Sequence, residues 1–191
     1  MKVYQSFDQD QLDVQYNVRA GIANHLDIFA GWKESGAKFR ASHDTRENIH
    51  YGDEDLQTFD LFSCGQDNRP VLVFIHGGYW QSLDKSDFSC LAAPFIGNGV
   101  NVAVVNYRLA PKATMADMVS DNRQVIKFLY ENASALRLDR NSIFVSGHSA
   151  GGHLTATMAG TDWLQYDLPR DAVKGICAIS GLYDLEPIRL S

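Results

Sequence analysis

The chain has 191 residues and a formal net charge of −6, from 17 lysines and arginines against 23 aspartates and glutamates. This length suits one domain, and 45% hydrophobic with 21% charged residues is typical of globular proteins, not of disordered or fibrous ones. No basic cluster offsets the acidic balance, which argues against binding to nucleic acid. The longest dense apolar run, residues 71–75, is too short to cross a membrane. The polar N-terminus lacks the apolar core of a signal peptide, so we expect a cytoplasmic protein.

The first elements in chain order fall in a mixed, polar segment. Scattered apolar residues over residues 1–45 indicate one or two helices in this N-terminal segment. Residues 56–62 roughly alternate apolar and polar, which predicts a strand with one exposed face. Residues 70–75 form a short unbroken apolar run, typical of a strand that is buried on both faces of a parallel sheet.

Helices and buried strands then alternate. A helical pattern over residues 88–96 precedes a strand at 100–105, and buried strands at 142–146 and 173–180 flank a helix at 150–159. This alternation predicts an α/β fold with a mainly parallel sheet flanked by helices. In such sheets ligands bind beyond the carboxyl ends of the strands, so the functional residues are expected there.

A long helix begins after Thr114, which has Asp117 three residues later in the position of a capping box. Its charged residues are predicted to form a solvated face. They are Asp117, Asp121, Arg123 and Lys127.

The strongest chemical signal is the segment Gly147-His148-Ser149-Ala150-Gly151, between the strand at 142–146 and the helix that follows. This is the Gly-x-Ser-x-Gly pattern in the strand–turn–helix context that it requires. Such a turn holds the serine in a strained conformation, with its hydroxyl exposed above the N-terminus of a helix, where partial positive charge favours an oxyanion. We therefore expect Ser149 to be a catalytic nucleophile. The alternative is a tight turn whose serine caps the following helix.

A second motif, His76-Gly77-Gly78-Tyr79-Trp80, ends the strand at 70–75. Hydrolases with such strands place an oxyanion-hole loop here, and the position predicts donors at the N–H groups of Gly78 and Tyr79, joined by that of Ala150. Losing one such donor costs roughly 3–4 kcal/mol of transition-state stabilisation. We expect His76 to hold the loop by hydrogen bonds and not to act as the base. Tyr79, Trp80 and Tyr107 either line an aromatic pocket or, as is commoner, pack in the core.

Together these motifs resemble the α/β-hydrolase fold, within the group related to hormone-sensitive lipase. The segment Tyr107-Arg108-Leu109-Ala110-Pro111 is similar to one common in those esterases. A tighter resemblance, from about Leu12 to Leu190, is to kynurenine formamidase (arylformamidase). Its hallmark is His-Gly-Gly-x-Trp, and three further segments look like that family. They are Gln15-Tyr16-Asn17, Tyr51-Gly52 and residues 180–187.

The resemblance implies one α/β-hydrolase domain over residues 1–191 and a serine hydrolase of acyl amides or esters. The family's reaction converts N-formylkynurenine into kynurenine and formate. The alternatives are a carboxylesterase on short acyl esters, and a catalytically incomplete fragment or one half of a split hydrolase.

A serine hydrolase also needs a histidine base and a carboxylate, which follow the serine in the order acid, then histidine. Of six histidines only His153 follows Ser149, one helical turn later, where we expect it to pack away from the serine. Asp184 is a weak candidate for the acid, since in the family it matches a structural position. The family continues with two strands that carry the acid and the base. We therefore expect a fold that lacks its last strands, with an uncovered sheet edge that promotes self-association.

No metal or cofactor is expected from the remaining motifs. The three cysteines, Cys64, Cys90 and Cys177, form no Cys-x-x-Cys pair and are predicted to be buried or half-buried thiols. The sequence contains neither a His-Glu-x-x-His motif nor a phosphate-binding loop.

Overall fold

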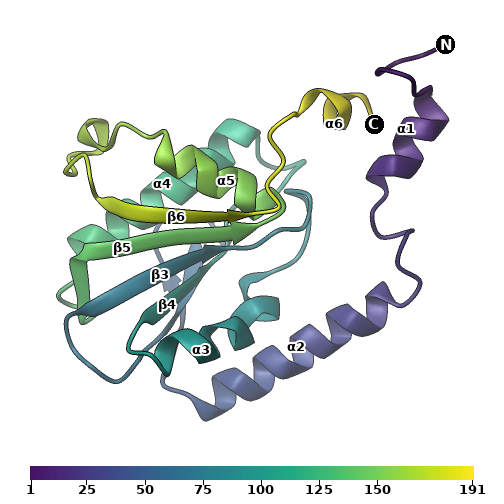
Figure 1. The fold of residues 1–191 in the computed structure, drawn as a ribbon. Coiled ribbons are helices and arrows are strands. Elements are labelled where there is room, and N and C mark those ends of the chain that lie inside the picture. The colour runs from purple at the N-terminus through teal and green to yellow at the C-terminus, as the bar shows by residue number, and fades with distance from the viewer.

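A computed structural model describes residues 1–191, which fold around one six-stranded sheet (Figure 1). The strand order is β1-β2-β4-β3-β5-β6, and the four strands from β4 to β6 in that order run parallel. β1 and β2 are antiparallel to their neighbours. The mainly parallel sheet confirms the predicted α/β class. The strands are β1 (Thr45–His50), β2 (Thr58–Phe62), β3 (Arg69–Ile75), β4 (Asn101–Val105), β5 (Leu138–His148) and β6 (Val173–Ile179).

Helices flank both faces of this sheet, as the sequence predicts. α4 and α5 cover one face, and α2, η1 and α3 lie against the other (Figure 1). None of the helices combines the length and the apolar character needed to cross a membrane. The helices are α1 (Gln9–Tyr16), α2 (His25–Ser42), η1 (Lys85–Ala92), α3 (Ala93–Ile96), α4 (Met115–Glu131), α5 (Ala150–Ala159), η2 (Trp163–Tyr166) and α6 (Glu186–Leu190).

The core has two parts, one on each face of the sheet. The larger cluster contains 26 buried residues and includes Val73 and Ile75 of β3. Phe74, between them, points to the opposite face and joins the smaller cluster of 6 buried residues with Phe39 of α2. Alternate side chains of one strand therefore enter both parts of the core, which is why residues 70–75 lack a polar face.

Two strands differ from their predicted burial because of their place in the sheet. All five residues of β2 are buried, although the alternation predicts an exposed face. Even the charged Asp60 is covered, and it is paired with Lys85. β6 is predicted to be buried but lies at the sheet edge, where Ile176 is 41% exposed. Cys177 on β6 is exposed as well, so the prediction for that thiol is wrong, whereas Cys64 and Cys90 are half-buried.

Helix α4 begins as predicted. The Thr114 hydroxyl accepts from the N–H of Asp117 (3.2 Å), and the Asp117 carboxylate accepts from the N–H of Thr114 (2.8 Å). The predicted solvated face is wrong for Asp121, which is fully buried. Its carboxylate is surrounded by donors from Arg108 and Gln57, so its charge is compensated inside the protein.

The edge of the sheet at β6 is the surface on which the prediction of self-association rests. β6 has no partner on its outer side, and a groove of about 340 Å³ beside it is lined by apolar side chains that include Phe144 and Ile176. We expect the 191-residue chain to associate as its concentration rises, and Ile176→Lys to reduce that association by adding a charge to the edge. Sedimentation velocity measures this. Leu164→Lys, at another exposed apolar position, is the matched control. A wild-type chain that stays monomeric would refute the prediction.

Candidate active site

The two sequence motifs meet at the carboxyl ends of β3 and β5. These strands are parallel neighbours, and Ile75 pairs with Gly147, so the turns after them leave the sheet side by side. The turns are in close contact at Gly77. A Cβ atom at this glycine would lie 2.9 Å from the His148 carbonyl oxygen and 3.2 Å from Ser149 Cβ. The absent side chain lets the backbone of the first motif approach the serine of the second.

Ser149 has the strained backbone expected of a nucleophile turn. Its φ of 56° and ψ of −119° lie in a region that non-glycine residues rarely adopt. Its N–H donates to the Ile179 carbonyl at 2.9 Å, which fixes the turn against the end of β6. Its side chain makes no capping hydrogen bond to α5, so the helix-cap alternative is wrong. The half-buried hydroxyl is left available for chemistry.

Glycines on either side of the serine allow close backbone packing. A Cβ at Gly147 would lie 2.4 Å from the Gly151 carbonyl oxygen, and one at Gly151 only 2.0 Å from the Ile75 carbonyl oxygen. Neither site has room for a side chain. The N-terminus of α5 is thereby held directly against the end of β3, beside the first motif.

The loop after β3 presents free N–H groups next to this turn. Gly78 has a φ of 107°, and Tyr79 and Trp80 have φ values of 59° and 57°. The N–H groups of Gly78 and Tyr79 donate no hydrogen bond to another backbone group. Ala150 is the first residue of α5, where helix N–H groups have no acceptor within the helix. The three predicted oxyanion donors therefore lie on the two touching turns.

His76 contacts the loop that it begins. Its ring is buried, with Nδ1 2.7 Å from the Gly77 carbonyl oxygen, and it stacks on Tyr107 with ring centroids 4.7 Å apart. The Tyr107 hydroxyl in turn donates to the His76 carbonyl at 2.9 Å. Burial lowers the pKa of His76, which favours a neutral ring. These contacts are those of a side chain that holds the loop in place.

The aromatic residues divide between core and site. Tyr107 and Trp80 are buried in the larger core cluster, whereas Tyr79 is only partly buried against it. His153 packs edge-on against Trp80, with ring centroids 5.4 Å apart, and burial lowers its pKa. His148 of the serine motif is exposed.

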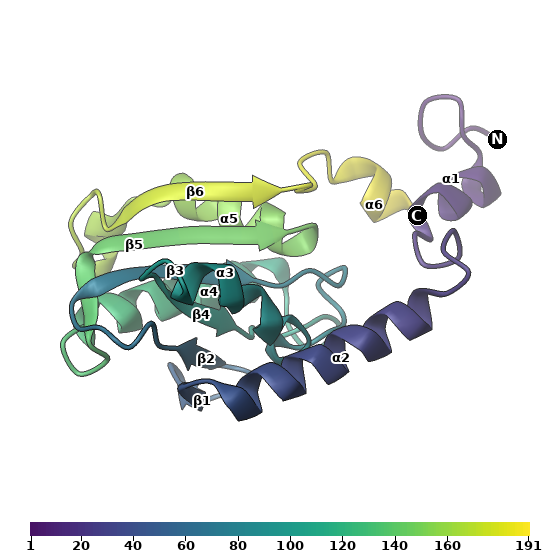
Figure 2. The same cartoon turned by 60° about the horizontal axis from the view of Figure 1, so that its bottom comes forward.

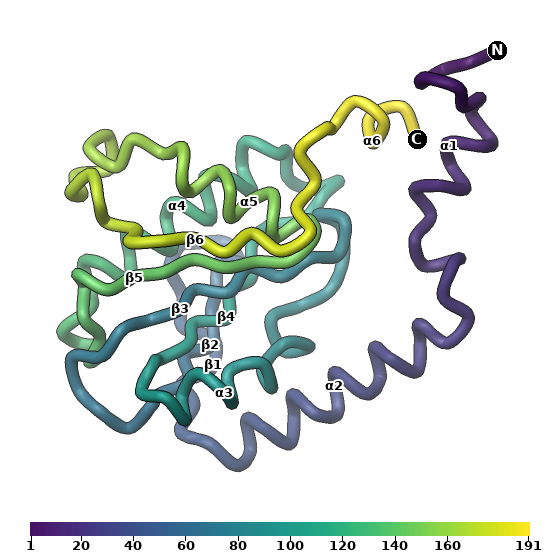
Figure 3. The backbone as a smooth tube through the Cα atoms, in the orientation of Figure 1, coloured from purple at the N-terminus to yellow at the C-terminus, as the bar shows by residue number.

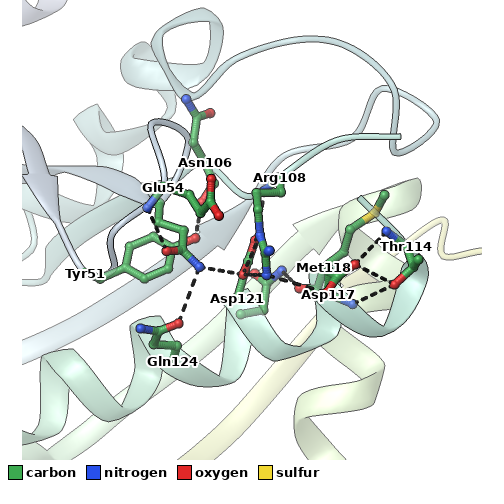
Figure 4. A network of polar contacts seen from close by, with 11 residues as sticks. Tyr51, Glu54, Asn106, Arg108, Thr114, Asp117, Met118, Asp121 and Gln124 are labelled. Carbon is green, nitrogen blue, oxygen red and sulfur yellow. Dashed lines mark hydrogen bonds and ion pairs between the residues drawn. The ribbon is translucent and has the colours of Figure 1, made fainter. Parts of the chain in front are cut away.

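The buried carboxylate of Asp121 is the centre of a polar network with the loop after β4 (Figure 4). Asp121 accepts from Arg108 Nε at 3.0 Å, from an Arg108 terminal nitrogen at 2.7 Å and from Gln57 Nε2 at 2.7 Å. The loop that contains Arg108 then donates from the N–H of Ala110 to the Trp80 carbonyl at 2.8 Å. Asp121 thus fixes the segment that is hydrogen-bonded to the end of the loop after β3.

Sequence reasoning missed this role, although a signal was present. Asp121 lies three residues after Met118 and four before Val125, on the apolar stripe of α4. A carboxylate at a core position needs a hydrogen-bond donor inside the protein. Arg108 is the cation that follows β4, the strand that precedes α4.

No complete catalytic triad is assembled within residues 1–191. Asp184 accepts from the Tyr4 hydroxyl at 2.6 Å and from the N–H of Glu186 at 3.2 Å, and it hydrogen-bonds to no histidine. The hydrogen bond to Asp184 raises the pKa of the Tyr4 hydroxyl. His153, the only histidine after Ser149, packs on Trp80 and makes no side-chain hydrogen bond to the serine.

The arrangement has a counterpart in known proteins. Residues 60–188 match the model of the BD-FAE family, and this segment contains both turns and the strands that carry them. The chain belongs to the BD-FAE family of α/β-hydrolases.

Curated relatives of this BD-FAE chain are hydrolases. Kynurenine formamidase of Danio rerio is 32% identical over 196 residues, which cover 98% of this chain and 65% of the relative. Kynurenine formamidase of Salmo salar is 35% identical over 158 residues, 82% of this chain and 52% of the relative. Isoprenylcysteine alpha-carbonyl methylesterase ICME of Arabidopsis thaliana is 34% identical over 131 residues, 68% of this chain and 31% of the relative. The chain thus spans less than two thirds of the length of each.

Solved structures confirm the predicted α/β-hydrolase fold for this BD-FAE member. A protein from Silicibacter sp. TM1040, solved under a provisional assignment as a thioesterase, superposes with a TM-score of 0.79 at 33% identity. The match covers 92% of this chain and 65% of that one. An esterase of Pyrobaculum calidifontis superposes with a TM-score of 0.69 at 20% identity, over 90% of this chain and 58% of the esterase.

Proposed function

We propose that this protein is a serine hydrolase that cleaves N-formyl arylamines such as N-formylkynurenine, to an arylamine and formate. One observation carries the proposal. Ser149 sits in a strained turn, in contact with a loop whose Gly78 and Tyr79 N–H groups have no backbone partner. The formamidases of Danio rerio and Salmo salar support the choice of substrate class.

In the proposed reaction the Ser149 oxygen attacks the formyl carbon. A tetrahedral oxyanion forms, and the N–H groups of Gly78, Tyr79 and Ala150 stabilise its charge more than that of the starting carbonyl. The amine leaves with a proton, and water then hydrolyses the formyl ester of Ser149 to release formate. A base must take the serine proton. His153 donates its backbone N–H to the Ser149 carbonyl at 3.0 Å, but its ring packs on Trp80. Because no histidine side chain of residues 1–191 is hydrogen-bonded to Ser149, we place this base outside these residues.

A second candidate function, a carboxylesterase on short acyl esters, is favoured by the Arabidopsis methylesterase relative. The nucleophile and the oxyanion donors are the same in both reactions, so only the leaving group and acyl group distinguish them. The partly buried Tyr79 beside the donors favours a small acyl group with an aromatic leaving group, because an aromatic ring adds contact area next to the reacting carbon.

Parallel rates on two substrates test the proposal. We expect kcat/KM for N-formylkynurenine to exceed that for a short acyl ester such as 4-nitrophenyl acetate by about tenfold or more, since binding of the aromatic amine contributes to transition-state stabilisation. Kynurenine and nitrophenolate absorb light, so both rates are measured by spectrophotometry. A higher value for the ester would support the carboxylesterase, and no hydrolysis of either substrate by the intact protein would refute both.

A further inference from the structure

The N-terminal segment lies near the carboxyl ends of β5 and β6 (Figures 2 and 3). In Figures 2 and 3, α1 lies beside α6, beyond the ends of β5 and β6. Two hydrogen bonds hold it there, from the Tyr4 hydroxyl to Asp184 and from Gln9 Nε2 to the Leu190 carbonyl (2.7 Å). The linker between α1 and α2 is therefore fixed near the side of the sheet that carries Ser149.

Arg19 in this linker reaches the oxyanion-hole loop. A terminal nitrogen of its guanidinium donates to Ser82 Oγ at 2.5 Å, and this hydroxyl donates to the Gly78 carbonyl at 2.9 Å. The Gly78 carbonyl and the Tyr79 N–H belong to the same peptide group. The Ser82 hydroxyl thus links Arg19 to a peptide group whose N–H is one of the proposed oxyanion donors.

The charge of Arg19 has no acidic partner. It forms no ion pair in the structure; its guanidinium donates to Ser82 and lies over the face of Phe29, 5.5 Å from the ring centroid. Two other cations of the fold differ in this respect, because Arg108 is paired with Asp121 and Lys85 with Asp60. A guanidinium offers five N–H donors in a planar fork that fits a carboxylate, and most of those of Arg19 are unused.

We propose that Arg19 binds a carboxylate on the leaving-group side of the substrate. The inference rests on the proposed function and sharpens its substrate class to N-acyl arylamines with a carboxylate away from the scissile amide. Burial raises the pKa of Tyr79, with a smaller effect from Tyr16, the last residue of α1, so the end of α1 lies near the loop that carries the donors. A charge-assisted fork to a carboxylate would orient the arylamine while the formyl group lies at Ser149.

Binding of a ligand without a scissile bond tests this. Isothermal titration calorimetry compares kynurenine with its carboxamide, which lacks the negative charge, on the intact protein. Arg19→Gln should weaken binding of kynurenine about tenfold or more and change that of the carboxamide less than about twofold. Arg170→Gln is the matched control, because Arg170 is exposed, has no ion pair and lies before the amino end of β6. It should alter neither affinity.

Each other outcome overturns the inference. These are equal weakening of both ligands by Arg19→Gln, no weakening, or no binding of kynurenine by the wild type. Hydrolysis is scored separately. If kynurenine binding depends on Arg19 but N-formylkynurenine is not cleaved, the proposed function fails and the carboxylate site remains. If N-formylkynurenine is cleaved and Arg19→Gln leaves its KM unchanged, the proposed function stands and the carboxylate site at Arg19 fails.

Discussion

In a protein that supplies the base, replacement of Ser149 by alanine is expected to abolish labelling by a fluorophosphonate and to lower hydrolysis on the order of 10⁶-fold, as in other serine hydrolases that lose their nucleophile. The reason is geometric. The Ser149 side chain makes no capping hydrogen bond to α5, and it lies beside the loop whose Gly78 and Tyr79 N–H groups have no backbone partner. Labelling is read by intact mass, and hydrolysis by the release of kynurenine.

Ser146→Ala is the matched control for this prediction. Ser146 lies three residues earlier on β5, but its hydroxyl already donates to the Cys177 carbonyl at 2.9 Å. We expect labelling of this variant to persist. Alanine at position 149 keeps a Cβ and the same backbone, so the unfolding temperature should change little. Labelling that survives Ser149→Ala, or that is lost equally in Ser146→Ala, would contradict the assignment of the nucleophile.

Replacement of Lys85 by methionine should lower the free energy of unfolding by about 3–5 kcal/mol, the usual cost of breaking a buried ion pair on one side. Lys85 Nζ lies 2.8 Å from Asp60, and the two side chains are only 6% and 1% exposed. Methionine preserves most of the aliphatic stem but leaves the carboxylate of Asp60 buried without a cation. One oxygen of that carboxylate already lacks a hydrogen-bond partner. Urea denaturation followed by circular dichroism measures the change.

Two further variants separate this effect from a general loss of charge. Lys127→Met removes a cation whose partners, Glu131 and Asp167, are largely solvated, and should cost about 0–1 kcal/mol. The double variant Asp60→Leu with Lys85→Met removes both buried charges and should recover much of the lost stability. If Lys85→Met costs no more than Lys127→Met, the buried pair does not contribute as argued.

The parts of the fold that the sequence predicts well are those set by local pattern. The strand before His76, the turn at Ser149 and the start of α4 at Thr114 each depend on residues within a few positions of one another. Burial of a strand depends instead on its neighbours in the sheet. β2 and β6 were therefore given the wrong exposure, because their sequences do not reveal that one is covered on both faces and the other lies at an edge.

Long-range polar contacts of the site were likewise beyond sequence pattern. Arg108 and Asp121 are 13 residues apart, and Arg19 and Ser82 are 63 apart, so no helical or strand period relates them. The charged side chains look alike along the chain, whether they are solvated or paired in the core. Only the packing of α4 against the loop after β4 distinguishes Asp121 from a surface aspartate.

The strained backbone around the site has a consequence for directed evolution of this protein. Four non-glycine residues with positive φ, namely Tyr79, Trp80, Leu83 and Ser149, lie on the two turns that form the candidate site or beside them. Each such conformation costs on the order of 1 kcal/mol or more. Truncation of the buried Trp80 would cost more than this strain, but variants selected for heat resistance would gain by placing glycine at Tyr79 or Ser149. Those same replacements would remove the aromatic side chain of Tyr79 or the nucleophile. Screens that score survival at high temperature should therefore enrich inactive proteins unless turnover is scored in the same round.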